Sequence, residues 1–501
     1  MIGSLRVAAK ELPVTSDPGL RRILFPVAIL ISTLWLTVPG TLAQTQSDAS
    51  PPPTSPGAPI PGTGGVAPFA GSVPQKLVPG ILPLSLQDAI NIGLKQNLGL
   101  LFSAASTRSA RGQRWQALSA LLPHAVASPF VAMSEINLAE QGITNLGPLK
   151  VPPSDGPFSY FDARAAVTQT LFDWKSISTA RAASQNLKSA EYTSKDARDL
   201  VVLAVGYTYL QAVADAARVD TAQAQVETAQ ALHDQANDQL NAGTSPEIDE
   251  IRAKVELQNR QQQLIQARND LAIQKLSVAR VIGLAPGQEF ELTDKGVYEE
   301  FQGITIDEAL KRAYASRSDY RAAEADVHAA ELLRKAAFAG YYPSLGFSAS
   351  YGIGGSHPSS ATQVSDVRGI LTIPIFQGGS VHGDVLQADA RLEESRESLE
   401  NLRAQIDSDI RAALLNLQSL ADRVNVARSN IDLAEKTLAQ SRVRFTAGVT
   451  DTVEVVQSQE LVASAHEQYI SSLYNYNFAR ISLARALGVA EQGVKEYFKG
   501  Q

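Results

Sequence analysis

Residues 344–354 read Ser-Leu-Gly-Phe-Ser-Ala-Ser-Tyr-Gly-Ile-Gly, and this stretch decides the class of fold. Its larger side chains fall on alternate residues, with serine and glycine between them. Because successive side chains of a β-strand point to opposite faces, the stretch predicts a strand with one apolar and one polar face. Its length, about 11 residues, suits a tilted strand that crosses a membrane. The apolar face, which we expect to meet lipid, carries Leu345, Phe347, Ala349, Tyr351 and Ile353.

Three more segments are predicted strands. Residues 366–376 alternate in the same way, with Leu371 and Ile373 on the apolar face, and residues 161–171 alternate as well. Residues 124–135 alternate poorly and contain Pro129. Polar segments rich in glycine and proline, about 137–158 and 355–365, are predicted loops. Four strands cannot close a barrel, since eight is the smallest usual number, so either several chains share one barrel or these are strands of a soluble sheet.

The strands belong to a unit that occurs twice in the chain. Residues 84–90 align with residues 304–310 at an offset of 220, and the same offset aligns Pro123 with Pro343. Residues 279–284 align with 484–489 at an offset of 205. Two copies at this period indicate a duplicated domain rather than a short-repeat solenoid. The predicted repeats are residues 84–284 and 304–489, with a connector at 285–303 and a tail at 490–501.

Each repeat is predicted to be mainly helical. A capping box opens each one, Ser85 with Asp88 and Thr305 with Glu308, and predicts a helix that runs to the proline before the first strand. Two long proline-free segments, 176–242 and 380–447, follow the strands. Apolar residues recur every seven positions, as in a coiled coil. The marker positions are Ile410, Leu417, Val424, Ile431 and Leu438.

The long helices are predicted to fold back as hairpins. Gly243 and Gly448 end them, and return helices are expected at about 246–282 and 451–487. The hairpin tips therefore lie far from the strands.

The N-terminus predicts export. Arg21 and Arg22 precede an apolar run, residues 23–38, and small residues allow cleavage after Ala43. The alternative is a retained anchor helix. Residues 44–80 are rich in proline and glycine and are predicted to be a flexible linker. No later stretch reaches the length of an uncharged membrane-spanning helix, so any later contact with the bilayer must be made by strands.

Composition excludes several classes of function. The net charge of −7 disfavours a nucleic-acid-binding protein. The chain has no cysteine and six scattered histidines, which gives no disulfide, no thiolate nucleophile and no metal-ligand spacing. No catalytic constellation is found, so the sequence predicts that the protein is not an enzyme and takes no cofactor or metal.

The combination of these features resembles the TolC family of outer-membrane efflux ducts, over about residues 84–489. The resemblance rests on the duplication, the Leu171-Phe172 and 374–379 strand ends, the Ala-Gly hairpin tips and the closing Ala-Arg-x-x-Gly pattern. It implies a fold that is mainly α with transmembrane β. Each chain of a homotrimer would give four strands to a shared 12-stranded outer-membrane β-barrel and its hairpins to a long antiparallel coiled-coil α-barrel in the periplasm.

The resemblance also implies site residues and partners. An acidic constriction near the periplasmic end would fall on Glu454, with Asp249 as its equivalent in the first repeat, while Gln457 replaces a second acid. The gate contacts of the family fall on Phe445 and Thr450. The hairpin tips, at Gly243 and Gly448, would dock a periplasmic adaptor (membrane fusion) protein that connects to an inner-membrane pump or ABC exporter.

The predicted function is therefore the outer-membrane channel of a tripartite efflux or type I secretion system. The alternative is a periplasmic coiled-coil adaptor or structural protein without a pore. It would share the hairpins but would not explain four alternating segments in a duplicated chain.

Overall fold

The computed structural model describes residues 69–497, except residues 70, 139, 141–144, 147–148, 151, 295, 297, 299 and 302. All described residues belong to one structural unit. The predicted export signal, residues 44–68 of the predicted linker and residues 498–501 of the predicted tail lie outside the described residues.

Each repeat begins with two short helices where the sequence predicts one. They are α2 (Leu86–Gln96) and α3 (Leu98–Ser119) in the first repeat, and α6 (Ile306–Ser316) and α7 (Ser318–Phe338) in the second. The predicted caps at Ser85 and Thr305 are confirmed. The single-helix prediction is wrong because the backbone is extended at Asn97 and Arg317, and the Asn97 side chain caps the new helix by accepting from the Gly99 amide at 3.0 Å.

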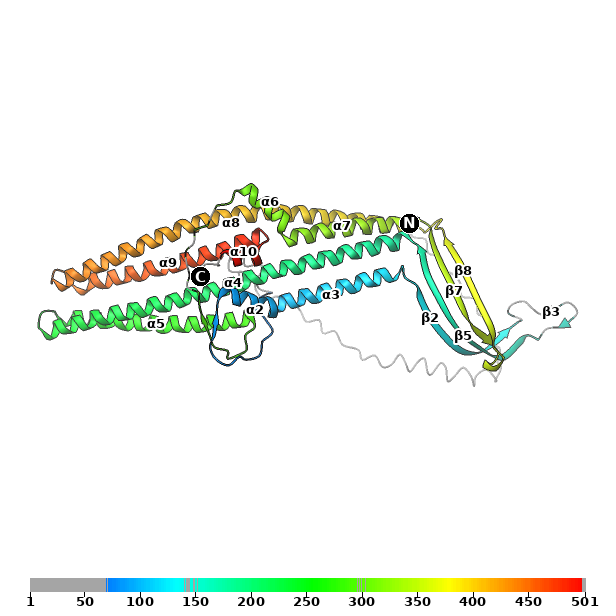
Figure 1. Ribbon diagram of the computed structural model, residues 1–501, viewed down its shortest axis with the longest axis horizontal. Helices are drawn as coiled ribbons and strands as arrows, with labels where there is room; N and C mark the ends of the chain where they lie inside the picture. Colours follow the sequence, from blue (N-terminus) through cyan, green and yellow to red (C-terminus); the bar gives the residue numbers. More distant parts are fainter. Residues whose placement is uncertain are drawn as a thin grey trace, which may run out of the picture. The chain divides into compact units, whose positions relative to one another are not determined.

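The long helical hairpins are confirmed. Helix α4 (Trp174–Asn241) returns as α5 (Glu247–Ile282), and α8 (Ser380–Thr446) returns as α9 (Thr452–Ala486). Helices α3, α4, α7 and α8 lie side by side in the half nearer the strands, and α5, α4, α9 and α8 lie side by side in the other half (Figure 1). On α8 the heptad positions Ile410, Leu417 and Val424 are buried.

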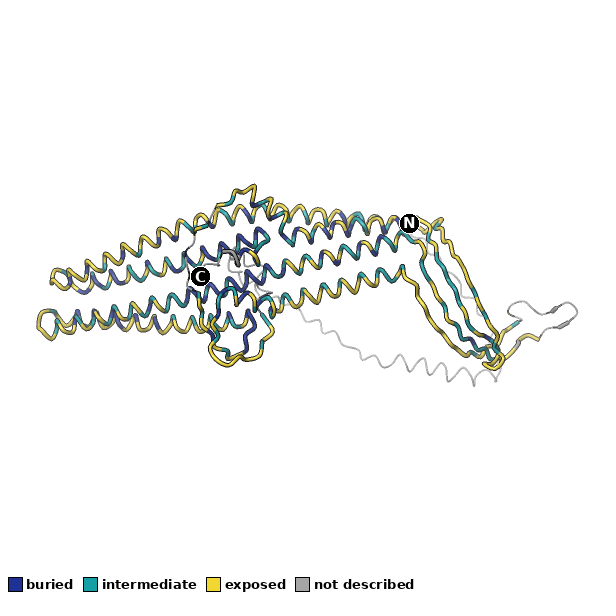
Figure 2. The backbone as a smooth tube through the Cα atoms, in the orientation of Figure 1, coloured by how far each residue is buried: buried dark blue, intermediate teal, exposed yellow. Residues whose placement is uncertain are grey.

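A second layer packs on the middle of these helices. It contains α2, α6, α10 (Ala490–Tyr497) and a parallel pair formed by β1 (Leu82–Leu84) and β6 (Phe290–Leu292). Buried residues concentrate here, around α2, α10 and the central part of α4, whereas β2 and β8 are mostly exposed (Figure 2). The core of the unit is therefore at the middle of the helices, and each hairpin extends from it.

Helix α4 also contains a segment that is long and apolar enough to cross a membrane, contrary to the sequence expectation. Most of that segment is buried. Val201, Val205 and Tyr209, within it, pack against α2 in the central core. The segment is apolar because other helices cover it on several sides, which makes it a core segment.

The four predicted strands form one antiparallel sheet with the order β2-β5-β7-β8. Strand β2 spans His124–Asn137, β5 Ser154–Phe172, β7 Ser344–Gly355 and β8 Thr362–Thr372. Strand β8 begins and ends four residues earlier than predicted. It ends before Pro374, which has no amide for the ladder. The predicted loop between β2 and β5 contains a short hairpin, β3 (Asn145–Leu146) with β4 (Leu149–Lys150).

The register separates the sheet into an apolar and a polar face. Leu345 lies opposite Leu371 and Ala349 opposite Val367, whereas Ser350 lies opposite Asp366. Leu371 and Tyr351 are each 62% exposed, so the apolar face has no cover within the described chain. A bulge between Thr170 and Phe172 breaks the alternation at the end of β5 and places Phe172 opposite Leu345.

Candidate functional site

The two hairpin tips are built in the same way. Gly243 has φ 70° and Gly448 has φ 69°, values that favour glycine. The Thr244 amide donates to the Gln239 carbonyl, and the Val449 amide donates to the Arg444 carbonyl, each at about 2.9–3.0 Å. The turns satisfy the last carbonyls of the long helices, so the tips are ordered ends.

Glu454 lies in the first turn of α9, just after the second tip. The Thr450 hydroxyl donates to its Oε2 at 2.5 Å. The Arg444 Nε lies 3.1 Å from its Oε1, across the hairpin. An acid at this place also interacts favourably with the N-terminal end of the helix dipole. Ser441 Oγ also donates to Glu454 Oε1 at 3.4 Å. Glu454 is therefore held by several groups of its own hairpin, and its charge is partly balanced by Arg444.

Asp249, the equivalent residue in the first repeat, is only 6% exposed. It accepts from Ser245 Oγ at 2.9 Å and from Thr452 Oγ1 at 2.8 Å. Thr452 belongs to the second hairpin and is fully buried. Asp249 thus joins the two tips of one chain, which is a different role from that of a carboxylate exposed to a passage.

The other predicted residues near the tip, Gln457, Phe445 and Thr450, have different surroundings. Gln457 is exposed, one turn beyond Glu454 on α9. Phe445 is 4% exposed and packs in a small apolar cluster between the two hairpins, and Thr450 bonds to Glu454. The structure therefore brings Thr450 and Glu454 together and places Phe445 in packing. The other members of the cluster are Leu232, Ala236, Ala253 and Val455.

Sequence reasoning missed Arg444, Thr452 and the buried hydroxyl pair of Ser441 with Ser458, whose oxygens are 2.8 Å apart. The spacing of residues around the hairpin turn could have predicted such contacts. In a hairpin, residues at equal distances from the middle of the turn face each other, and counting outward from Val449 and Thr450 pairs position 441 with 458.

A second polar cluster lies on the polar face of the sheet. Asp162, 3% exposed, accepts from Tyr160 Oη at 2.8 Å and from Arg164 Nε at 2.6 Å. A Cβ at Gly352 would lie 2.2 Å from the Ala163 carbonyl oxygen, so glycine is required there. The glycines of β7 make room for this cluster on β5.

A buried ionic cluster joins the two repeats in the middle of the helices. Arg485 Nη2 donates to Asp196 Oδ1 at 2.6 Å and lies 3.8 Å from Asp319 Oδ2, which Arg317 also contacts at 2.6 Å. Burial raises the pKa of Asp196 to about 6, against the opposing effect of Arg485. In the same cluster burial raises the pKa of Asp199. Burial therefore makes ionisation of Asp196 and Asp199 costly. Against the opposing effect of burial, the pKa of Asp319 is lowered by the hydrogen bond from Arg317 and by the charges of Arg317 and Arg485.

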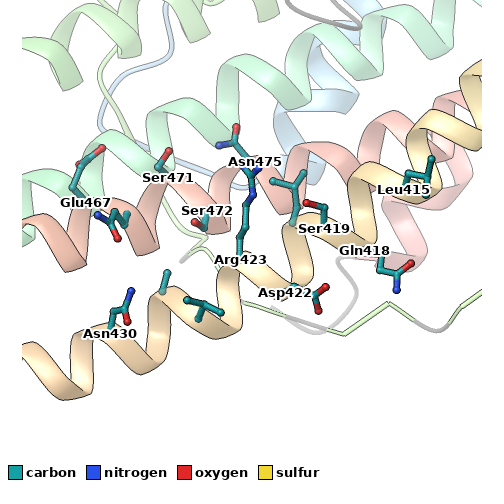
Figure 3. Close-up of a pocket in the computed structure, with 14 residues that line it drawn as sticks. Leu415, Gln418, Ser419, Asp422, Arg423, Asn430, Glu467, Ser471, Ser472 and Asn475 are labelled. Carbon is teal, nitrogen blue, oxygen red and sulfur yellow. The ribbon is translucent and has the colours of Figure 1, made fainter.

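A groove of about 800 Å³ runs between α8 and α9. Asp422 and Arg423 come to it from α8, and Ser471, Ser472 and Asn475 come from α9 (Figure 3). The groove is mixed in polarity and open along the side of the second hairpin. Among the described residues, no group of three histidine or acidic side chains could hold a metal ion.

With this geometry established, comparisons with known proteins decide the family. Residues 89–284 and 309–489, one segment from each repeat, match the outer membrane efflux protein family. The chain belongs to this family. Its members are outer-membrane channels and not enzymes, so the protein is an outer-membrane efflux channel with a TolC-like fold.

Curated relatives span most of the chain. The chain is 25% identical to the alkaline protease secretion protein AprF of Pseudomonas aeruginosa, over 82% of this chain and 87% of that protein. It is 24% identical to the pyoverdine export outer membrane protein OpmQ of Pseudomonas putida, over 86% of this chain and 93% of that protein.

Solved structures show the same fold. The outer membrane protein VceC of Vibrio cholerae superposes with a TM-score of 0.69 at 20% identity, over 80% of this chain and 96% of that one. CusC superposes with a TM-score of 0.69 at 18% identity, over 83% of this chain and 99% of that one. The predicted class, mainly helical with transmembrane strands in a TolC-like arrangement, is confirmed.

Proposed function

We propose that three copies of this chain form one duct, which receives substrates from a periplasmic adaptor and an inner-membrane pump or ABC exporter and releases them outside the cell. Relatives named for protease secretion and pyoverdine export support a role in export. The alternative of an adaptor without a pore does not fit the family or the exposed apolar face of the sheet.

The observation that carries the proposal is the open four-stranded sheet. Strands β2 and β8 each have a neighbour on one side only within the described chain. In lipid, every backbone amide and carbonyl must find a partner, so the two edges have to pair with other copies. Three copies give twelve strands, a usual even number for an outer-membrane barrel.

The helices would continue this barrel as a wall of hairpins, with the tips at the far end. Glu454 and Gln457 follow the second tip, and three copies of Glu454 would form an acidic constriction there. Asp249 would support that constriction by tying one tip to the other, and Phe445 and Thr450 would fix the second hairpin against the first. The tips around Gly243 and Gly448 would dock the adaptor.

Disulfide cross-linking tests the barrel, because the chain has no cysteine of its own. One cysteine replaces Ala127 on β2, and a second replaces Ser365, Val367 or Gly369 on β8 in separate variants. If β2 of one copy pairs with β8 of the next, at least one combination should give covalent species that end at three chains. Species of only one or two chains from all three combinations would contradict the proposal.

A matched control uses strands already paired within one chain. Ala165 on β5 lies opposite Tyr351 on β7. Cysteines at these two positions should form a disulfide inside each chain and give no covalent trimer, which shows that the oxidation reports register and not random collision.

A further inference from the structure

A small basic and aromatic pocket lies at the end of the helices where the strands begin. Its volume is about 250 Å³. Three helical segments meet there, the start of α4, the end of α7 and the start of α8 (Figure 1). The lining residues are Trp174, Arg334, Lys335, Phe338, Tyr342 and Val385.

The pocket lies at the boundary of the apolar sheet face. Strand β7 starts at Ser344, two residues after Tyr342 of the pocket. On the neighbouring chain segment, between β8 and α8, Ile375 is 96% exposed and Phe376 is 88% exposed. Membrane proteins carry aromatic side chains at the level of the lipid headgroups, where one end of a ring is apolar and the other is hydrated. If the sheet crosses the outer membrane as a barrel, the pocket lies at the level of the headgroups.

The pocket opens on the face of the helices that carries the second layer. Tyr314 of α6 donates to the Arg403 carbonyl of α8, and Arg403 covers the Tyr314 ring. Arg396 lies one heptad before Arg403 on α8 and pairs with Glu331. Asp389 lies two heptads before Arg403 and pairs with Arg334 of the pocket. Because heptad positions keep their face in a coiled coil, the pocket and α6 share one face.

That face is the outside of the proposed duct. Three copies of α2, α6, α10 and the β1–β6 pair inside the passage would obstruct it, so the layer has to lie outside. In this respect, as in the position of the pocket at headgroup level, the inference rests on the proposed function.

The two cationic side chains of the pocket, Arg334 and Lys335, have N–H groups that are free to bind a ligand. Arg334 uses its Nε for Asp389, and no partner within the described chain takes its terminal nitrogens. The side-chain ammonium of Lys335, which is exposed, has no hydrogen-bond or ion-pair partner among the described residues. Phe338 stacks edge-on against Tyr342 at 5.9 Å, and Arg181 lies 5.9 Å from the centre of the Trp174 ring. We propose that this pocket binds the phosphate headgroup of an anionic phospholipid in the leaflet that faces the helices.

The first repeat provides an internal contrast. At the offset that aligns the two prolines, Arg114 corresponds to Arg334, Trp115 to Lys335 and Leu122 to Tyr342. Arg114 donates to Ser184 at 3.2 Å, and no lysine or tyrosine accompanies it. The duplicated fold alone therefore does not require the basic pair, which is a feature of the second repeat.

Quenching of Trp174 fluorescence tests the proposal. The chain has three tryptophans, so a variant with Trp35→Phe and Trp115→Phe keeps Trp174 as its only one. This protein is reconstituted in phosphatidylcholine vesicles with increasing fractions of phosphatidylglycerol brominated on its acyl chains. We expect half-maximal quenching at a far lower fraction of brominated phosphatidylglycerol than of brominated phosphatidylcholine. Lys335→Gln should raise the fraction of phosphatidylglycerol required by about fivefold, as for the loss of one cation near an anionic surface.

Two controls distinguish lipid binding in the pocket from nonspecific electrostatic attraction of anionic lipid to the protein. Lys188→Gln, an exposed lysine four turns along α4, should leave the fraction unchanged. Inorganic phosphate at millimolar concentration should not relieve the quenching, since the proposed ligand is a lipid. Equal quenching by the two brominated lipids, an unchanged value in Lys335→Gln, or displacement by inorganic phosphate would each overturn the lipid site. Absence of quenching by both lipids would place Trp174 out of contact with lipid and overturn the lipid site, whereas the proposed function is tested separately by the cross-linking of β2 to β8.

Discussion

Asn97 and Arg317 make the same contact at equivalent places in the two repeats. Asn97 Nδ2 donates to the Val281 carbonyl at 3.5 Å, and Arg317 Nη1 donates to the Ala486 carbonyl at 3.5 Å. Each residue stands between two short helices, and each carbonyl ends a return helix. The same junction is thus made by an amide in one repeat and by a guanidinium in the other, and only the second brings a charge.

The Arg317 charge at the second junction belongs to the ionic cluster that contains Asp196. Because Asp196 titrates in this cluster, the stability of the folded chain should depend on pH. The pKa of Asp196 is raised from 3.8 to about 6 in the folded chain. The folded state therefore binds this proton more tightly than the unfolded state, and stability falls as pH rises from about 4 to 6. At pH 7, Asp196→Asn should be more stable than the parent by about 1–3 kcal/mol. Thermal unfolding from pH 4 to pH 8 should show the gain only above about pH 5. A gain that is equal at all these pH values would contradict the assignment.

The contact between Thr452 and Asp249 should couple the two hairpin tips. Thr452→Val leaves a buried carboxylate without one of its donors, at a cost of about 1–3 kcal/mol. A double-mutant cycle with Asp249→Asn, followed by chemical denaturation, should give a coupling free energy of about 1 kcal/mol or more. Thr437→Val is the control, since its hydroxyl bonds only within its own helix. Full additivity of the two tip substitutions would disprove the link.

Glu454 should set the cation preference of the channel. Glu454→Ala should raise the concentration of a trivalent cation needed for half-block by roughly tenfold, which corresponds to about 1.4 kcal/mol. Arg444→Ala should lower that concentration, because Glu454 loses the cation that balances it. Glu397→Ala, an exposed acid far from the tip, should have no effect. Block that is the same in all four channels would place Glu454 outside the passage.

The apolar sheet face should not tolerate a charge. Leu371→Arg should cost about 2–4 kcal/mol near the middle of the bilayer and reduce the amount of protein in outer membranes. Ser350→Arg is the matched control, because Ser350 lies on the opposite face, across from Asp366. Equal loss of inserted protein in both variants would show that the faces are wrongly assigned.

The sequence predicted the regular parts of this fold because they follow simple periods. Alternation predicted three of the strands, the matched place in the duplicated unit predicted β2, and the seven-residue repeat with Gly243 and Gly448 predicted the hairpins. The breaks at Asn97 and Arg317 were missed because the helical pattern continues through them. A local side-chain cap interrupts it at Asn97, and at Arg317 the break is accompanied by contacts of the guanidinium with residues distant in the sequence.

The candidate site was predicted less completely than the fold. Position along the hairpin placed Glu454 and Asp249 near the tips, but their surroundings depend on residues distant in the sequence. Asp249 is buried by Thr452 of the other hairpin, and Glu454 is paired by Arg444 across the turn. Such partners are set by the packing of four helices, which no single helical period records.

The central claim, that three chains close one conducting barrel, is tested most directly by measuring mass and conductance on the same purified sample. In mild detergent, light scattering corrected for bound detergent should give three times the mass of one mature chain. That species, and no smaller one, should insert into planar bilayers and conduct ions. A monomer that inserts and conducts, or a trimer that inserts without conductance in any condition, would contradict the account.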